Sequence, residues 1–230
     1  MAPGPLLLGD YLQAPACPQL AATPYGSLGK TDLAEFLAAW PDLHREALSR
    51  IEHRIHPSAR VHSTALIGDD VIIGRGAQVW EFTTVRDGSV IGAGASVGFN
   101  CEVTHAFIGE GAVLGHRIGI NRTLVGSGAH LSANLTVAAI SMWSPQMRTP
   151  EREIILRTSE GIYRCGTPRF GALIGDGVQT GNNISLGPGL AVGRNCRITS
   201  GVTLAGRSIP DHHTVSNPRT TDVNVHRHRR

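Results

Sequence analysis

This 230-residue chain has few of the residues that mark several common protein classes. Aromatic residues make up only 5% of it, and its four cysteines, Cys17, Cys101, Cys165 and Cys196, show no paired spacing. The formal net charge is only +3, and part of the basic excess lies in the last residues, 226–230. The charge is too weak to indicate a nucleic-acid partner. We expect reduced thiols and a disordered basic tail that binds nothing.

Long hydrophobic runs are also missing from the sequence. The longest apolar stretches fall far short of the roughly 20 residues that a membrane-spanning helix needs. The first residues show no charged region followed by an apolar run, so we expect no signal peptide. These features predict a cytoplasmic protein without a membrane partner.

What the sequence does contain is an aliphatic residue at every sixth position over much of its length. The series runs through Ile55, Val61, Ile67, Ile73, Val79, Val85, Ile91, Val97 and Val103, resumes at Ile108, Leu114, Val125, Leu131 and Val137, and returns at Ile174, Leu186, Val192, Ile198 and Leu204. A period of six fits neither an α-helix nor a strand with two-residue alternation. It fits a triangular coil in which each side is one short strand and the aliphatic residue points inward. A fixed short period of this kind is typical of a solenoid.

Small residues and turn-forming residues support the same interpretation. Alanines lie two places before the next aliphatic residue, at Ala59, Ala65, Ala77, Ala95 and Ala112. Glycine, asparagine and aspartate gather where a coil needs corners. A β-sandwich, the alternative, would space its turn signals about 8–12 residues apart and contain more aromatic residues. The sequence therefore predicts an all-β solenoid over residues 55–209, with three hexads per coil and coils stacked roughly 4.8 Å apart.

The composition of the segment before the repeat predicts an arm followed by a helical cap. Residues 1–30 are rich in proline, glycine and alanine and show little periodicity, which favours an arm lying on the body. Residues 31–54 predict two helices, one capped by Thr31 and the second beginning at Pro41. We expect this segment to cover the open end of the solenoid, because uncovered coils expose strand edges. A helix that docks a partner is the alternative.

The repeat is interrupted at residues 141–170 and ends near 209. The interruption predicts an inserted loop with a two-stranded excursion that turns at Thr158–Gly161. Long loops on regular scaffolds commonly carry function, which we favour over a tolerated insertion. Residues 210–230 form the predicted tail.

Two stretches resemble a known family. The pattern as a whole is similar to the left-handed parallel β-helix of hexapeptide-repeat acyltransferases. Residues 85–88 (Val-Arg-Asp-Gly), 97–102 and Gly115-His116 resemble motifs in the acetyltransferase domain of the bifunctional glucosamine-1-phosphate acetyltransferase/uridylyltransferase. Residues 169–183 resemble a stretch in archaeal-type sugar-1-phosphate nucleotidylyltransferases. The resemblance covers residues 55–209 and implies the left hand of the coil.

The resemblance implies roles for individual residues. His116 is the implied general base, and a neutral imidazole suits that role because acyl transfer to an amine requires removal of a proton near neutral pH. Arg86 and Glu102 are implied at the acceptor, where guanidinium can grip phosphate or carboxylate oxygens. The backbone amide of Ala133 is implied at coenzyme A, and Arg194 and Arg197 are candidates for its phosphates. Each of these side chains, taken singly, is also compatible with an ordinary solvated corner residue.

Departures from the family pattern affect the acceptor site. Thr104 stands where the family has a lysine, Gly119 where it has a tyrosine and His130 where it has an asparagine. Residues 139–142 replace a further substrate-binding stretch. We therefore expect an N-acyltransferase that uses acetyl-CoA or another acyl-CoA without a metal. Its expected acceptor is an amino sugar, an aminocyclitol or a related amine other than glucosamine-1-phosphate.

Three alternatives remain at this point. One is a non-catalytic regulatory or scaffold β-helix, and another is an enzyme that accepts a carrier-protein thioester. The third is a zinc enzyme like the γ-class carbonic anhydrases, which would need His105, His116 and His130 to converge. The resemblance also implies a homotrimer whose sites lie between subunits, with the 141–170 loop in reach of a neighbour.

Overall fold

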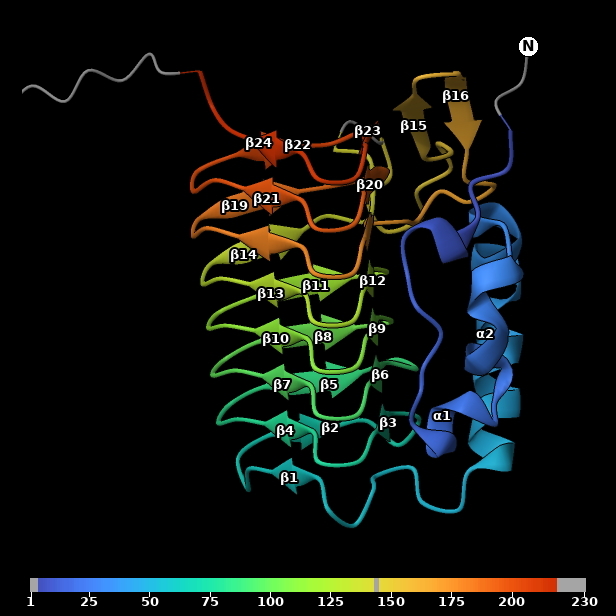
Figure 1. Cartoon of the computed structure of the whole chain (residues 1–230), viewed down its shortest axis with the longest axis vertical. Helices are drawn as coiled ribbons and strands as arrows, with labels where there is room; N and C mark the ends of the chain where they lie inside the picture. The colour runs from blue at the N-terminus through green and yellow to red at the C-terminus, as the bar shows by residue number, and fades with distance from the viewer. Residues whose placement is uncertain (1–3, 143–144, 219–230) are drawn as a thin grey trace, which may run out of the picture.

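The chain winds into a parallel β-helix whose axis runs vertically in Figure 1. The computed structural model describes residues 4–142 and 145–218. Each coil contributes one short strand to each of three sheets, and strands of successive coils pair in parallel, as Val79 does with Val97 and Val97 with Leu114. The predicted solenoid is therefore confirmed.

The three sheets form three faces of a prism, which we call the first, second and third faces. The first face holds β1 (Arg60–Val61), β4 (Gln78–Val79), β7 (Ser96–Val97), β10 (Val113–Leu114), β13 (His130–Leu131), β18 (Gln179–Thr180), β21 (Arg197–Ile198) and β24 (Thr214–Val215). The second holds β2 (Leu66–Ile67), β5 (Thr84–Arg86), β8 (Glu102–Thr104), β11 (Gly119–Asn121), β14 (Leu135–Val137), β19 (Ile184–Leu186) and β22 (Thr203–Leu204). The third holds β3 (Ile72–Ile73), β6 (Val90–Ile91), β9 (Phe107–Ile108), β12 (Leu124–Val125), β17 (Ala172–Ile174), β20 (Leu190–Val192) and β23 (Arg207–Ile209).

The residues of the six-residue repeat fill the interior of the prism. Ile73, Val85, Ile91 and Val103 are completely buried in one core cluster that extends to Val202. The alanines Ala77, Ala95 and Ala112 are also completely buried in it, as the pattern predicts. Only small side chains fit beside the aliphatic ones in so narrow an interior, which explains their regular spacing.

The third face is apolar on its outside as well, and this decides where the helices lie. The outward residues of its strands are buried: Ile72, Val90, Phe107, Leu124, Leu173 and Ala191. The N-terminal segment and α2 (Leu33–Arg50) cover them, so the helix runs along the flank of the β-helix (Figure 1). The expectation that the helical segment would cover the open end is therefore wrong. Burying the apolar stripe of one whole face removes more hydrophobic surface from water than covering one coil would.

The helical segment is also one helix and not two. Asp32 caps it, since its Oδ1 accepts a hydrogen bond from the Ala34 N–H at 2.9 Å, whereas Thr31 was expected in this role. Pro41 lies inside the helix, and the helix ends at Arg50 and not at Arg54. Proline removes one backbone hydrogen bond there, but Trp40 and its buried neighbours hold the helix against the third face. None of the described helices is long and apolar enough to cross a membrane.

Residues before α2 form the predicted arm on the body. The arm contains η1 (Leu8–Asp10), α1 (Pro18–Ala21) and η2 (Pro24–Lys30). Side chains of the coil bind the backbone of the arm. Asp176 accepts a hydrogen bond from the Gln13 N–H, and Glu110 accepts one from the Cys17 N–H. Ordered contacts along this length keep the arm in place.

The insertion and the end of the chain extend the β-helix. The predicted two-stranded excursion is present as the antiparallel hairpin of β15 (Ile155–Thr158) and β16 (Gly161–Arg164). β15 pairs with β23, so the hairpin lengthens the third face, and the Tyr163 hydroxyl donates to Asp32 at 2.6 Å. The coil continues to β24 and does not stop at 209. The expected disorder of the tail concerns residues 219–230, which lie outside the described residues.

Candidate functional site

The corner between the first and second faces is built from a stack of turns with the same conformation. Phe82, Asn100, Arg117 and Asn134 occupy its left-handed position, with φ between 53° and 61°. Backbone hydrogen bonds join the levels, from the Arg117 N–H to the carbonyl of Phe99 at 2.9 Å and from the Asn134 N–H to the carbonyl of His116 at 3.0 Å. His116 is therefore held directly between Phe99 and Ala133, one coil to either side.

A groove of about 510 Å³ runs along the first face beside this corner. His116, His130 and Ala133, all of them predicted site residues, line it together. The other lining residues are Trp80, Glu81, Ser96, Gly98, Phe99, Val113, Leu114, Gly115, Ser132 and Asn182. The groove thus combines two exposed imidazoles with a largely apolar wall.

Ordered polar contacts fix parts of the groove, and one polar group is left open. The indole Nε1 of Trp80 donates to Ser96 Oγ at 3.1 Å, and the Ser132 N–H donates to Thr180 Oγ1 at 2.9 Å. The N–H of Ala133 has no hydrogen-bond partner among the described residues. Ala133 thus brings an unpaired backbone donor to the lining of the groove.

The predicted acceptor residues gather on the neighbouring second face. Arg86 on β5 donates to Glu102 on β8 at 2.5 Å, and both side chains are about half exposed. This contact, more than any other, raises the pKa of Arg86. Gly119 pairs in register with Glu102, and both line a shallow hollow of about 350 Å³. The structure therefore places Arg86, Glu102 and Gly119 together, across the corner from His116.

Thr104 also belongs to the second face but is not open to solvent. It pairs in register with Arg86, and only 7% of its surface is exposed. Its hydroxyl has no hydrogen-bond partner within the described part of the chain. A buried hydroxyl without a partner is uncommon and costs free energy.

The two predicted phosphate-binding arginines lie in different places. Arg197 on β21 is exposed and belongs to the same outward ladder of the first face as His130, with Gln179 between them. Arg194 lies at the corner between the third and first faces, where it donates to the carbonyls of Gly9 at 2.8 Å and Tyr11 at 3.2 Å. It holds the N-terminal arm and is not part of the groove.

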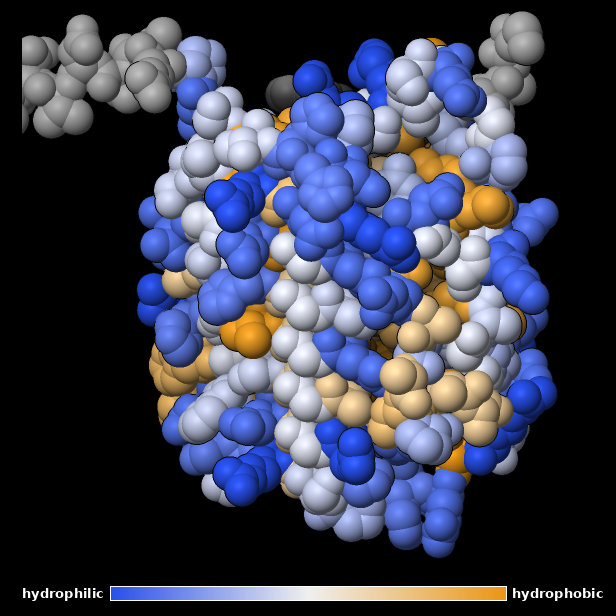
Figure 2. Space-filling model, in the orientation of Figure 1, coloured by the Kyte–Doolittle hydropathy of each residue, from blue (hydrophilic) through white to orange (hydrophobic). Residues whose placement is uncertain are grey.

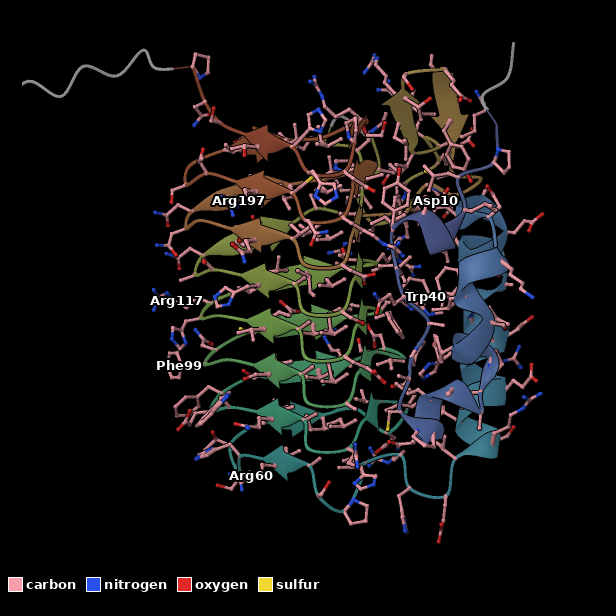
Figure 3. All side chains as sticks on the ribbon, in the orientation of Figure 1. Asp10, Trp40, Arg60, Phe99, Arg117 and Arg197 are labelled. Atoms are coloured by element: carbon pink, nitrogen blue, oxygen red, sulfur yellow. The ribbon has the colours of Figure 1, made fainter. Side chains whose placement is uncertain are left out.

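Several groove residues were missed from the sequence. Trp80 and Phe99 are the largest of them, and both side chains remain partly exposed. Figure 3 places Phe99 and Arg117 along the edge that lies away from α2, and Figure 2 shows an apolar patch at the same edge. Large aromatic residues at corner positions, in a chain with so few of them, were the signal that could have identified this wall.

The three histidines of the zinc alternative do not converge within the chain. His105 lies at the corner between the second and third faces, and its ring centroid is 4.4 Å from that of Trp40. Burial, and then the nearby Arg122, lower the pKa of His105 to about 4. Over residues 4–142 and 145–218, no three His, Cys, Asp or Glu side chains are grouped so that they could hold a metal ion. The 141–170 insertion, which was expected to carry function, contributes no described residue to the lining of the groove.

Comparisons with known proteins find remote likenesses. No curated protein sequence matches the chain. Among solved structures, the UDP-N-acetylglucosamine acyltransferase from Campylobacter jejuni is 16% identical with a TM-score of 0.36, and the match covers 70% of this chain and 67% of that one. The polySia specific acetyltransferase NeuO is 13% identical with a TM-score of 0.41, covering 71% and 85%. AntD, an N-acyltransferase from Bacillus cereus, is 16% identical with a TM-score of 0.39, covering 76% and 84%.

One family model also matches. It describes the GMPPB C-terminal domain and matches residues 51–152. The matched stretch runs from the end of α2 through β14 and includes every residue that lines the groove except Asn182.

Proposed function

We propose that this protein is a CoA-dependent N-acyltransferase with His116 as its general base. The observation that carries the proposal is the groove in which His116 and the unpaired N–H of Ala133 lie side by side. Transfer of an acyl group from a thioester needs a base for the attacking amine and a donor for the oxyanion. Both are present here in one place.

The proposed reaction is a direct transfer. The amine nitrogen attacks the thioester carbon, and His116 accepts the proton that the amine loses. The carbonyl oxygen gains negative charge as the tetrahedral intermediate forms, and the N–H of Ala133 donates a hydrogen bond to it. The carbon–sulfur bond then breaks, and the thiolate of coenzyme A leaves with the proton that His116 returns. No residue of the enzyme is acylated.

The surfaces beside His116 suit the two substrates. Trp80, Phe99 and Val113 give the groove an apolar wall for the acyl group and the pantetheine arm. Arg197 lies two strands from His130 on the same ladder, about 10 Å away, where it can meet phosphates of coenzyme A. Arg86 and Glu102 can bind hydroxyl and amino groups of an amino sugar, an aminocyclitol or a related amine.

A homotrimer would complete this site. Phe82 is 60% exposed at the groove corner and packs edge-on against Phe99, with 5.8 Å between ring centroids. Trp80 and Leu66 are exposed as well. Exposed apolar residues beside a groove are typical of an interface. We propose that neighbouring copies cover this corner and enclose the groove between two chains.

The first test is binding and turnover with the full chain. Coenzyme A should raise the melting temperature of the protein, as a ligand of the folded state does. Acetyl-CoA and short acyl-CoAs should release free thiol when phosphorylated or nucleotide-linked amino sugars and aminocyclitols are supplied. A protein that neither binds coenzyme A nor releases thiol with any amine would be a scaffold and not an acyltransferase.

A further inference from the structure

A second polar cluster lies at the corner between the second and third faces, across the second face from His116. Asp87, His105 and Arg122 stack there in the left-handed conformation, one per coil. The Arg122 N–H donates to the carbonyl of Thr104 at 3.1 Å, and the Arg122 carbonyl accepts from the Gly171 N–H at 2.9 Å. The backbone around Arg122 is therefore fixed from both sides.

The charges at this corner are not balanced. Arg122 is half-buried, and among the described residues its guanidinium makes neither a hydrogen bond nor an ion pair. Arg169, two residues before Gly171, is close enough to lower the pKa of Arg122 further, after burial. Arg169 itself donates to the carbonyl of Arg148 at 2.6 Å, which is a neutral acceptor. Two partly buried, positively charged guanidinium groups thus lie near each other, and neither forms an ion pair with a carboxylate of the described residues.

The acidic and histidine side chains near Arg122 do not neutralise its positive charge. Asp87 acts in the opposite direction, but it is the weakest influence on Arg122 and lies 3.8 Å from Arg86. His105 is held neutral at physiological pH by its lowered pKa. Partial burial of the Arg122 charge beside a like charge costs free energy, and no carboxylate of residues 4–142 or 145–218 forms an ion pair with either guanidinium group. A bound anion would offset this cost.

A buried hydroxyl lies on β8, the strand that leads to this corner. Val103 points into the core, so Thr104, next to it on β8, faces outward like Arg86 and Asn121 on the neighbouring strands. Thr104 carries the buried hydroxyl without a partner, and its carbonyl is bonded to Arg122. The two guanidinium groups themselves present several N–H donors, which a ligand with several acceptor oxygens would satisfy together.

We infer that Arg122 and Arg169 form a binding site for a phosphate group, at the opposite edge of the second face from the acyl-transfer groove. Guanidinium groups bind phosphate through paired N–H donors, and a dianion neutralises both charges at once. The phosphate belongs to a phosphate ester or to a nucleoside diphosphate. The site does not depend on the proposed acyl transfer, since none of its residues lines the groove.

Calorimetric titration of the full chain with pyrophosphate and with UDP tests the site. Arg122→Gln and Arg169→Gln should each weaken pyrophosphate binding at least tenfold. Arg75→Gln should change it by less than twofold, because Arg75 is an exposed arginine at a different corner of the coil. Tighter binding of UDP than of pyrophosphate identifies a nucleotide ligand, and equal binding identifies a phosphate ester.

Thermal unfolding separates this role from a structural one. Without phosphate, Arg122→Gln should leave the melting temperature unchanged or raise it, because it removes the repulsion from Arg169. The rise in melting temperature that pyrophosphate gives the parent protein should disappear in the variant. Absence of pyrophosphate binding by the parent protein, or equal losses in Arg122→Gln and Arg75→Gln, would overturn the inference.

Discussion

The hydroxyl of Tyr25 donates a hydrogen bond to Nδ1 of His44 at 2.8 Å, between the N-terminal arm and α2. Nε2 of the same ring lies 2.6 Å from the carbonyl of Asp70, which can only accept, so Nε2 carries the proton. Trp40 Nε1 donates to the Tyr25 oxygen at 3.2 Å. One chain of hydrogen bonds therefore ties the arm, α2 and the coil together.

Removing the Tyr25 hydroxyl should destabilise the protein. In Tyr25→Phe, both Nδ1 of His44 and Nε1 of Trp40 lose their partner while they remain buried, which costs about 1–3 kcal/mol. Urea unfolding followed by circular dichroism measures this loss. Ser27→Ala, at an exposed position of the same arm, should change the free energy of unfolding by less than about 0.5 kcal/mol. Equal stability of Tyr25→Phe and the parent protein would show that the chain of hydrogen bonds is not formed.

His105 should make stability depend on pH. Its pKa in the folded state is about 4, below the ordinary histidine value of 6.5, because burial and Arg122 disfavour its charge. Between these two values the unfolded chain binds a proton that the folded chain does not, so stability falls as pH decreases from 6.5 to 4. His105→Gln should flatten this part of the profile, measured as melting temperature against pH. His62→Gln changes an exposed histidine at a corner of the coil and should leave the profile of melting temperature against pH unchanged. Identical profiles for His105→Gln and the parent protein would contradict the assignment.

Arg194 and Arg197 should give opposite results when each is changed to glutamine. Arg194→Gln releases the carbonyls of Gly9 and Tyr11 and should lower stability by about 1–3 kcal/mol, with little effect on coenzyme A binding. Arg197→Gln should leave stability unchanged and weaken coenzyme A severalfold. Calorimetry and urea unfolding of both variants check the pair. The account of the groove fails if Arg197→Gln binds coenzyme A as tightly as the parent protein.

The aromatic corner should control assembly. A charge in place of Phe82 would sit in the proposed contact between copies, so Phe82→Asp should convert trimers into monomers and reduce activity with them. Light scattering during size-exclusion chromatography gives the mass. Ile162→Asp is the control, because Ile162 is exposed on the β15–β16 hairpin. A parent protein that is monomeric and fully active would contradict the proposed interface.

The repeat determined most of what the sequence could predict about the fold. Residues such as Ile73, Val85 and Ile91 can only point into a narrow interior, so their period defines the coil. The sequence does carry a signal for the flank position of α2, since the residue before the inward aliphatic is apolar from β3 to β20 on the third face and polar at most positions of the other two faces. Ile72, Val90 and Phe107 contrast there with Gln78 and Ser96 on the first face.

The site was predictable only in part. The motif around His116 indicated the corner, and the register of the coil then brought His130 and Ala133 to it. Arg194 could not be distinguished from Arg197, because its role depends on the path of an arm with no periodicity. Pro41 was expected to begin a second helix because helix propensity is a local property. The packing of Trp40 against the third face instead keeps Pro41 inside one continuous helix.

The most direct test of the account is the rate of thiol release by His116→Asn, measured with an amine that the parent protein accepts. Asparagine keeps the polarity of the position and cannot accept the proton, so kcat should fall by about 10²–10⁴-fold. The dissociation constant of coenzyme A, measured by calorimetry on the same preparation, should change by less than threefold. A variant that retains the full kcat would contradict the role of His116 as the general base.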